Sequence, residues 1–316
     1  MIDYLDFEKP VAALARSAEE LRATDTPEAA AEAGRLDTRA AKMLADLYAR
    51  LTPWQRTQVA RHAHRPRFSA YRTALTDDWM PLSGDRAFAD DPAIIGGLAT
   101  VGGRKVVLIG HEKGHDTTSR LTHNFGMGRP EGYRKAIRLM ELAGRFGLPV
   151  VTLVDTAGAF PGIDAEARGQ AEAIARATQA CLALPVPMVA AIVGEGGSGG
   201  AVALAAANRV LMFENAIYSV ISPEGCASIL WRTDGTTTNQ AALAAEAMKV
   251  TAQDLLKLGV IDRIVAEPTG GAHRAPAAAT SALKAALCEE LETLSRETPA
   301  ALQAARRRKF LTIGTL

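Results

Sequence analysis

The residues of this chain best suited to chemistry lie where an apolar run gives way to a glycine-rich turn and an alanine-rich segment. Five glycines fall between Gly194 and Gly200. Glycine lets the backbone approach a bound group closely, and the first N–H groups of a helix have no partner within that helix. Fixed, unpaired donors stabilise an anion, or an oxygen on which negative charge develops during a reaction. The stretch therefore predicts an enzyme with a backbone oxyanion site.

The spacing of these glycines also fits a dinucleotide-binding turn. Gly194, Gly196 and Gly199 follow the G-x-G-x-x-G pattern, and Glu214 lies where such a fold places the acidic residue that binds a ribose. A P-loop is excluded because no Lys-Ser or Lys-Thr pair follows the glycines. A flexible turn that serves only close helix packing is an equally weighted alternative. The glycine pattern alone does not separate these interpretations.

Ser198 and Glu195 offer side-chain chemistry within the same stretch. Gly196-x-Ser198-x-Gly200 has the spacing of a nucleophile elbow, which makes a serine hydrolase an alternative. Such a serine needs a histidine base, and His273 is the only histidine that follows it. Glu195 could be the acid or base of a hydratase, or could bind amides of the loop. We predict a structural role for Ser198, because a lone histidine is more often structural than catalytic. We also predict a structural role for Glu195, as a partner of loop amides.

A second strand–turn–helix unit precedes the glycine-rich stretch. Val150–Val154 is a continuous apolar run, typical of a strand buried on both faces, and it ends at Asp155–Gly162. Asp164 is predicted to cap a helix that continues to about Ala180. Pro187–Val193 then forms the strand that leads into the glycines. Successive parallel strands present their turns at one edge of a sheet, so the two turns are predicted to form adjacent walls of a cleft.

The remaining pattern predicts an α/β protein that begins with a helical arm. Before residue 65, apolar residues recur at helical spacing among Arg, Glu and Asp, in a segment too thin to bury a core of its own. Gly102 and Gly103 separate two strand-like runs and predict a hairpin. The predicted elements are strands over Ile94–Thr100, Lys105–Ile109, Arg209–Phe213 and Val260–Val265, and helices over Glu131–Phe146 and Ala241–Leu258.

Composition is that of an ordinary globular protein. The 316 residues are 48% hydrophobic and 22% charged, with a net charge of +1. This balance excludes a strong field for nucleic acid or an anionic membrane. Cys181, Cys226 and Cys288 lie too far apart for a zinc ribbon or a disulfide framework, and no apolar run is long enough to span a bilayer. The N-terminus lacks a signal-peptide core, so we expect a cytoplasmic protein. The cysteine spacing leads us to expect no metal site in this chain.

Six longer motifs resemble one family in order and spacing. They are GDRAFADD (84–91), NFGMGRPEGYRKA (124–136), DTAGAFPG (155–162), GEGGSGGA (194–201), YSVISPEGCASILW (218–231) and GGAHR (270–274). Together they resemble the carboxyltransferase alpha subunit of bacterial acetyl-CoA carboxylase, from LDFEKP near the N-terminus to about His273. The chain departs from that family at Ala157, where proline is usual, and at Phe160, where tyrosine is common. The stretch Thr233–Asn239 also looks slightly expanded.

The resemblance implies a fold and a division of the chain. The fold is α/β and crotonase-like, from the ClpP/crotonase superfamily, a spiral of ββα units with an N-terminal helical arm. The arm would occupy residues 1–65, and a carboxyltransferase domain ending in a helical tail would occupy residues 66–316. A serine hydrolase or an enoyl-CoA hydratase-like enzyme on the same fold is the alternative that this resemblance leaves.

The resemblance also implies an activity shared with other proteins. Together with a zinc-ribbon beta subunit, as α2β2, the family transfers a carboxyl group from carboxybiotin to acetyl-CoA and forms malonyl-CoA for fatty acid biosynthesis. Biotin is carried on the biotin carboxyl carrier protein, and biotin carboxylase loads it in an ATP-dependent step. In this family the alpha subunit contributes the biotin side of the site.

Backbone groups are the expected site residues. The N–H groups of Gly199 and Gly200, at the predicted helix start, are expected to hold the ureido oxygen of biotin as negative charge develops on it. The freed biotin nitrogen can take the proton from acetyl-CoA, so no side-chain base is required. The walls of the biotin site are expected to be formed by Gly158, Ala159, Phe160, Pro161, Gly162, Gly196, Gly197 and Ser198.

Overall fold

A single sheet forms the centre of the molecule in the computed structural model, which describes residues 3–231 and 237–314. In the described residues this sheet has eight strands. They are β1 (Thr76–Pro81), β2 (Ile94–Val101), β3 (Arg104–His111), β4 (Val150–Thr156), β5 (Met188–Gly197), β6 (Arg209–Phe213), β7 (Ile217–Ser219) and β8 (Arg263–Val265).

The order of strands across the sheet follows the order in the chain. It runs β1-β2-β3-β4-β5-β6-β8, with β7 paired to the end of β5. The first three strands are antiparallel, and the pairs from β3 to β8 are parallel. A dinucleotide-binding fold reverses its strand order at the cofactor site, and this sheet has no such reversal. The dinucleotide interpretation is therefore not supported by the topology.

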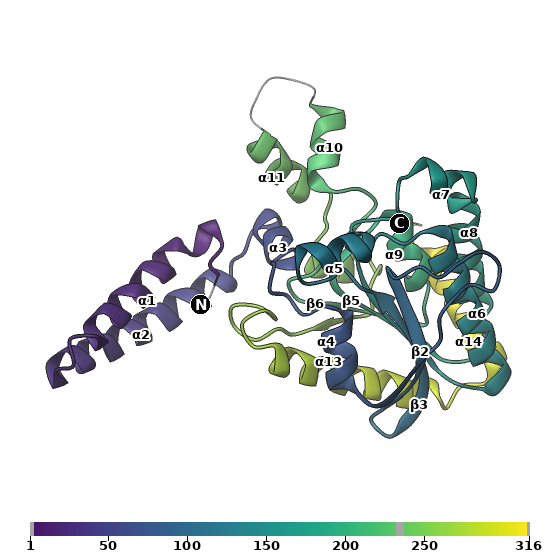
Figure 1. Ribbon diagram of the computed structural model, residues 1–316, viewed down its shortest axis with the longest axis horizontal. Helices are drawn as coiled ribbons and strands as arrows, with labels where there is room; N and C mark the ends of the chain where they lie inside the picture. Colours follow the sequence, from purple (N-terminus) through teal and green to yellow (C-terminus); the bar gives the residue numbers. More distant parts are fainter. Residues whose placement is uncertain (1–2, 232–236, 315–316) are drawn as a thin grey trace.

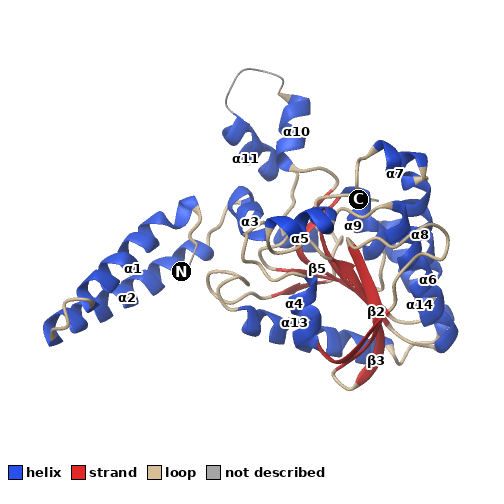
Figure 2. Ribbon diagram, in the orientation of Figure 1, coloured by secondary structure: helices blue, strands red, loops and turns tan. Residues whose placement is uncertain are grey.

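Helices cover both faces of the sheet (Figures 1 and 2). One layer contains α6, α8 and α9, and the other contains α4 and α13. In chain order the helices of the described residues are η1 (Asp6–Glu8), α1 (Lys9–Arg22), α2 (Pro27–Tyr48), α3 (Pro53–Ala60), α4 (Phe68–Leu75), α5 (Thr117–Thr122), η2 (Asn124–Gly126), α6 (Pro130–Phe146), α7 (Ile163–Ala167), α8 (Gln170–Ala183), α9 (Ser198–Ala205), α10 (Pro223–Leu230), α11 (Thr237–Ala247), α12 (Ala252–Lys257), α13 (Pro276–Leu294) and α14 (Pro299–Thr312).

The central strands β4 and β5 form the most buried part of the core. Every residue of Val150–Thr156 is buried, and so is every residue of β5 except its last, Gly197. A strand with helices on both faces needs apolar residues at successive positions, because both of its sides lie in the core. The continuous apolar runs in the sequence therefore become the strands that carry the two loops.

Two projections leave this body (Figure 1). Helices α1 and α2 form a hairpin that extends away from the sheet, and α10 and α11 form a smaller lobe. The chain returns to the body by residue 56, because Arg56 Nη1 donates to the carbonyl of Glu214 at 2.9 Å. Arg65 is buried and pairs with Glu267 at 2.7 Å. The division of the chain at residue 65 remains a prediction.

Several sequence predictions are confirmed. Strands β2 and β3 form the predicted hairpin, and Gly102 and Gly103 have φ of +55° and +77°, as its tight turn requires. Helix α6 ends at Phe146, and Gly147 follows with φ of +67°. Strands β4 and β5 are parallel neighbours, and the turns after them lie at the same sheet edge. Within the described residues, no helix is long and apolar enough to cross a membrane.

Two predicted helices are wrong because the chain breaks within them. The helix expected from Asp164 to Ala180 is divided into α7 and α8 by Gly169, whose φ is +81°, and Asp164 lies inside α7 rather than capping it. The helix expected over Ala241–Leu258 is divided into α11 and α12, with Lys249 at φ of +54° between them. The possible expansion at Thr233–Asn239 lies largely outside the described residues, which resume at position 237.

Candidate functional site

The two glycine-containing turns pack directly against each other at the carboxyl edge of the sheet. Thr156 at the end of β4 lies beside Gly196 near the end of β5. A Cβ on Gly197 would lie 2.2 Å from the carbonyl oxygen of Ala157. A Cβ on Gly200 would lie 2.7 Å from the carbonyl carbon of Gly158. Only glycine permits this contact, so the sequence requirement follows from backbone packed on backbone.

The second turn delivers the chain into the start of α9. Gly197 is the N-cap of α9 and no side chain caps the helix. The first N–H groups of a helix lack intrahelical partners, so those at Ser198, Gly199 and Gly200 are left as candidate donors. Gly199 is half-buried, whereas Gly200 is buried beneath the other turn. These are the two residues expected to hold an oxyanion, and they lie where such donors are available.

The opposite wall is fixed by residues that sequence reasoning missed. The side-chain amide of Gln170 donates to the carbonyls of both Gly128 and Phe160 at 2.9 Å. The N–H of Phe160 donates to the carbonyl of Gly128 at 3.0 Å. The guanidinium of Arg129 lies 4.4 Å from the centre of the Phe160 ring. Phe160, which replaces a common tyrosine, therefore packs beneath a cation.

The Gly158–Gly162 turn is closed by its own short contacts. Gly158 has φ of +155°, and its carbonyl accepts a hydrogen bond from Thr156 Oγ1 at 2.7 Å. Pro161 follows Phe160, and a Cβ on Gly162 would lie 2.3 Å from the Phe160 ring. Ala159 is half-buried, and its N–H lies 2.9 Å from where a Cβ on Gly200 would be. Gly158 and Ala159 therefore pack against Gly200, while Phe160 and Gly162 contact each other farther along the same turn, and their role as walls remains a prediction.

An apolar groove runs along α9 from the glycine-rich turn. Its volume is about 530 Å³, and its lining includes Ser198, Gly199, Val202, Tyr218, Val220 and Leu255. Val220 is largely exposed on the rim of this groove. The groove suits an apolar ligand or a partner surface next to the candidate donors.

A second, cationic cavity borders the two turns. It has a volume of about 230 Å³ and reaches Ala157 and Glu195. Arg61, Arg67, Lys113 and Arg120 also line it. Arg120 has no carboxylate partner among the described residues, so this lining carries more positive than negative charge. Such a cavity favours an anion.

The serine triad is not assembled. No histidine side chain hydrogen-bonds Ser198 in the described part of the chain. His273 instead stacks on His62, with ring centres 3.8 Å apart. Burial, followed by the charges of neighbouring histidines and arginines, lowers the pKa of His273 to about 3. The structure therefore separates the two residues that a serine hydrolase would need to join.

Glu195 has a structural position, but not the one expected for it. Its two carboxylate oxygens accept hydrogen bonds from Arg61 Nε at 2.6 Å and from Lys113 Nζ at 2.7 Å, rather than from loop amides. The prediction of amide binding is wrong because two cations that are distant in sequence, Arg61 and Lys113, donate to the two oxygens of this carboxylate. Burial raises the pKa of Glu195, but Lys113 and Arg61 outweigh that effect and hold it below its ordinary value.

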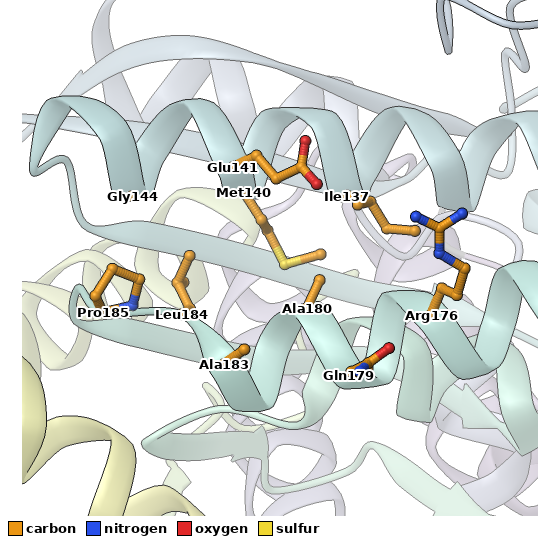
Figure 3. Close-up of a pocket in the computed structure, with 10 residues that line it drawn as sticks. All are labelled: Ile137, Met140, Glu141, Gly144, Arg176, Gln179, Ala180, Ala183, Leu184 and Pro185. Atoms are coloured by element: carbon orange, nitrogen blue, oxygen red, sulfur yellow. The ribbon is translucent and has the colours of Figure 1, made fainter.

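A further cavity lies away from both turns, between α6 and α8 (Figure 3). It has a volume of about 420 Å³, and Met140, Glu141 and Arg176 are among its lining residues. None of the predicted site residues lines it. Among the described residues, no group of three or more His, Cys, Asp or Glu side chains could hold a metal ion. The turns at the ends of β4 and β5 are therefore the candidate site.

Solved structures define the class of fold. Transcarboxylase 12S is similar with a TM-score of 0.59 and 18% identity, over 72% of this chain and 41% of that one. The beta subunit of P. aeruginosa geranyl-CoA carboxylase is similar with a TM-score of 0.56 and 16% identity, over 79% of this chain and 46% of that one. The chain matched in the Pseudomonas malonate decarboxylase MdcD-MdcE heterodimer has a TM-score of 0.58 and 20% identity, over 77% of this chain and 96% of that one. The fold is that of the crotonase-type carboxyltransferases, which confirms the predicted fold class.

Closer relatives define the family. A family model described as acetyl co-enzyme A carboxylase carboxyltransferase-like matches residues 4–314. The acetyl-coenzyme A carboxylase carboxyl transferase subunit alpha of Rhizorhabdus wittichii is 68% identical, over 99% of this chain and all (100%) of that protein. The protein of the same name from Zymomonas mobilis is 63% identical over 99% and 100%. The chain belongs to the family of acetyl-CoA carboxylase carboxyl transferase alpha subunits, and the resemblance stated from its motifs is confirmed.

Proposed function

We propose that this chain is the alpha half of a biotin-dependent carboxyltransferase that converts acetyl-CoA to malonyl-CoA for fatty acid biosynthesis. The family assignment supports the reaction class. The single observation that carries the site is the uncapped start of α9, packed against the Gly158–Gly162 turn. This arrangement offers fixed backbone donors at one position, beside a groove and a cationic cavity.

The donors act where negative charge develops. Biotin, carried on a separate protein, supplies the carboxyl group and then a ring nitrogen able to accept a proton. The N–H groups of Gly199 and Gly200 would donate to the ureido oxygen of biotin, which becomes negative as the carboxyl group leaves the ring nitrogen. Because they are fixed before the reaction, they stabilise the transition state more than the ground state. Losing one such donor typically lowers turnover about 100- to 1000-fold.

The residues present fit a flat ring better than a side-chain catalyst. Gly199 lines the groove without a side chain of its own, so a planar group can approach the backbone at the start of α9 closely. Ser198 has no base, and Glu195 already accepts hydrogen bonds from two cations. The proton transfer therefore needs no acid or base from this chain, and its backbone groups orient and stabilise.

The partners follow from the half-formed site. The apolar groove beside Gly199 is open on the side of Val220 and is suited to contact with a second polypeptide. We propose that a beta subunit with a zinc ribbon covers it and holds most of acetyl-CoA, in an α2β2 assembly. The biotin carboxyl carrier protein would present biotin after biotin carboxylase has loaded it. This complex would operate in the cytoplasm, with no metal in the alpha chain.

The proposal is tested by activity with and without the partner. The purified chain should not decarboxylate malonyl-CoA in the presence of free biotin, because the two halves of the site lie on different subunits. Addition of the beta subunit should restore the activity. Full activity from a preparation shown by mass spectrometry to lack the partner would contradict the divided site.

A further inference from the structure

A group of ion pairs underlies the glycine-rich turn and lines part of the cationic cavity, and none of its members has a chemical step in the proposed reaction. Lys113 Nζ lies 2.8 Å from Asp155 Oδ1 and 2.7 Å from Glu195 Oε2. Arg61 Nε lies 2.6 Å from Glu195 Oε1, and Arg67 Nη1 lies 3.2 Å from Asp155 Oδ2. We call Arg61, Arg67, Lys113, Asp155 and Glu195 the buried ion-pair network.

The network grips the first residues of the turn by backbone as well as by side chain. The N–H of Glu195 donates to Asp155 Oδ1 at 2.9 Å. A Cβ on Gly194 would lie 2.5 Å from the same oxygen, so the chain is pressed against Asp155 at two successive residues. The candidate donors at Gly199 and Gly200 follow Glu195 closely in the chain. A shift of the backbone at Glu195 would therefore also move these donors.

The charges of the network are balanced by its neighbours. Arg61 also pairs with Glu224 in the first turn of α10, so three cations face three carboxylates. Burial raises the pKa of Asp155, but Lys113 and Arg67 outweigh it and lower that pKa overall. Both inner carboxylates therefore stay ionised at neutral pH. If Lys113 loses its charge, two buried carboxylates face each other without the cation between them, and they repel.

We infer that Lys113, Asp155 and Glu195 are positioning residues, which hold the glycine-rich turn so that its N–H donors point at the reacting oxygen. The inference rests on the proposed function only for the identity of that oxygen. Arg61 and Glu224 extend the same chain of contacts to the α10–α11 lobe. Glu195 thus acts through the backbone that it anchors and does not transfer a proton.

The test compares two buried lysines in the assembled complex. Lys113→Met removes the central cation, whose side chain is 11% exposed. The matched control is Lys309→Met, whose side chain is 14% exposed and pairs with Asp262. Asp262 accepts from the N–H of Val210 at the start of β6, at the opposite edge of the sheet. Lys113→Met removes two lysine–carboxylate pairs, to Asp155 and Glu195, and Lys309→Met removes one, to Asp262, but only Lys113 lies beneath the turn.

The expected result separates turnover from binding. Lys113→Met should lower kcat by about 10- to 100-fold and leave the KM for acetyl-CoA within about twofold, because the donors are misplaced while the thioester site is intact. Hydrogen exchange of the segment 194–205 should be faster than in the unaltered complex. Lys309→Met should leave both kcat and exchange in this segment unchanged. A change in KM alone, or normal kcat with normal exchange, would overturn the inference.

A double variant guards against a simple loss of folding. Glu195→Gln keeps the shape of the side chain, and with Lys113→Met it leaves Asp155 paired with Arg67 and Glu224 paired with Arg61. Repulsion is then absent, so the double variant should be less impaired than the product of the two single effects predicts. Strictly multiplicative losses would contradict the network. Faster exchange in Lys113→Met would persist even if the proposed chemistry were wrong, so the two failures can be told apart.

Discussion

At the scale of single residues, Ser198 combines the spacing and strained backbone of a nucleophile elbow with the absence of a histidine partner among the described residues. Its φ is +52°, a conformation that non-glycine residues rarely adopt and that costs of the order of 1–3 kcal/mol. The packing of Gly197 and Gly200 against the neighbouring turn imposes this conformation on the residues between them. The strained residue therefore lies where two backbones come together, at the first position of α9.

Ser198→Ala tests whether the hydroxyl takes part in the reaction. Since no histidine within residues 3–231 and 237–314 hydrogen-bonds Ser198, we expect turnover of the assembled complex to stay within about tenfold, equivalent to about 1.4 kcal/mol of barrier. The measurement is kcat for carboxyl transfer, with circular dichroism as the control for folding. A nucleophile would lose several orders of magnitude, so a folded and assembled but inactive Ser198→Ala complex would reinstate the hydrolase alternative.

At the scale of elements, the GGAHR segment fastens the N-terminal arm to the body. Arg274 Nη2 lies 2.8 Å from Glu8 Oε1, and the hydroxyl of Tyr48 donates to the same oxygen at 3.0 Å. The neighbouring residue His273 stacks on His62 with an angle of 16° between the rings. Both ring nitrogens of His273 are buried, and neither has a hydrogen-bond partner in the part of the chain that the structure describes. A charge on this stack would be poorly solvated.

This stack predicts that acid weakens the protein through His273. Burial, followed by the charges of His62 and Arg274, lowers its folded-state pKa from 6.5 to about 3. The unfolded chain therefore binds more protons between these values, and the free energy of unfolding falls as the pH falls below the unfolded pKa. His273→Phe keeps an aromatic ring but cannot be protonated, so it should lose less stability on acidification than the unaltered chain.

Urea denaturation at about pH 7 and about pH 5 measures this difference, because the carboxyl groups take up protons mainly below this pH range. The unaltered protein should lose more free energy of unfolding between the two conditions than His273→Phe does. Equal losses in both proteins would show that another group, such as His62, controls the acid response.

The elements also show what could and could not be predicted from the sequence. Strands β4 and β5 and the turns that follow them were predictable, because a strand buried on both faces needs a continuous apolar run. The break at Gly169 was missed because a single residue with positive φ leaves the helical apolar pattern on either side intact. The contacts of Gln170 and Lys113 were missed as well, because they join residues that only the folded sheet brings together.

At the scale of the whole molecule, two unlike surfaces border the glycine-rich stretch. The groove of about 530 Å³, which reaches Ser198 and Gly199, is mostly apolar, and the cavity of about 230 Å³, which reaches Glu195, is also lined by four cations. A transferase that moves an anionic carboxyl group onto a thioester needs both kinds of surface near one point. The apolar side is open at Val220, and this is the surface that the proposed beta subunit would cover.

Whole-molecule packing also decides how the donors can be tested. Gly200→Pro, the simplest way to remove an N–H, would place a Cβ 2.7 Å from the carbonyl carbon of Gly158. Loss of activity would then report a collision between the two turns as much as the loss of a donor. A Cβ on Gly199 meets Ile174 at 3.3 Å, but a proline there would follow Ser198, whose backbone is already strained. A replacement that adds no side-chain atom is required.

The most direct measurement is therefore the turnover of the complex after an amide is replaced by an ester. Incorporation of glycolate in place of Gly199 or Gly200 exchanges the N–H for an oxygen and adds no other group. The matched control is the hydroxy-acid analogue of Ala205, the last residue of α9, whose helical N–H bonds one turn back at Ala201, beyond the glycine-rich turn. We predict that kcat falls about 100- to 1000-fold for an ester at Gly199 or Gly200 and far less for the control. Near-normal turnover with esters at both positions, in folded and assembled complexes, would contradict the claim that backbone donors of α9 hold the reacting oxygen.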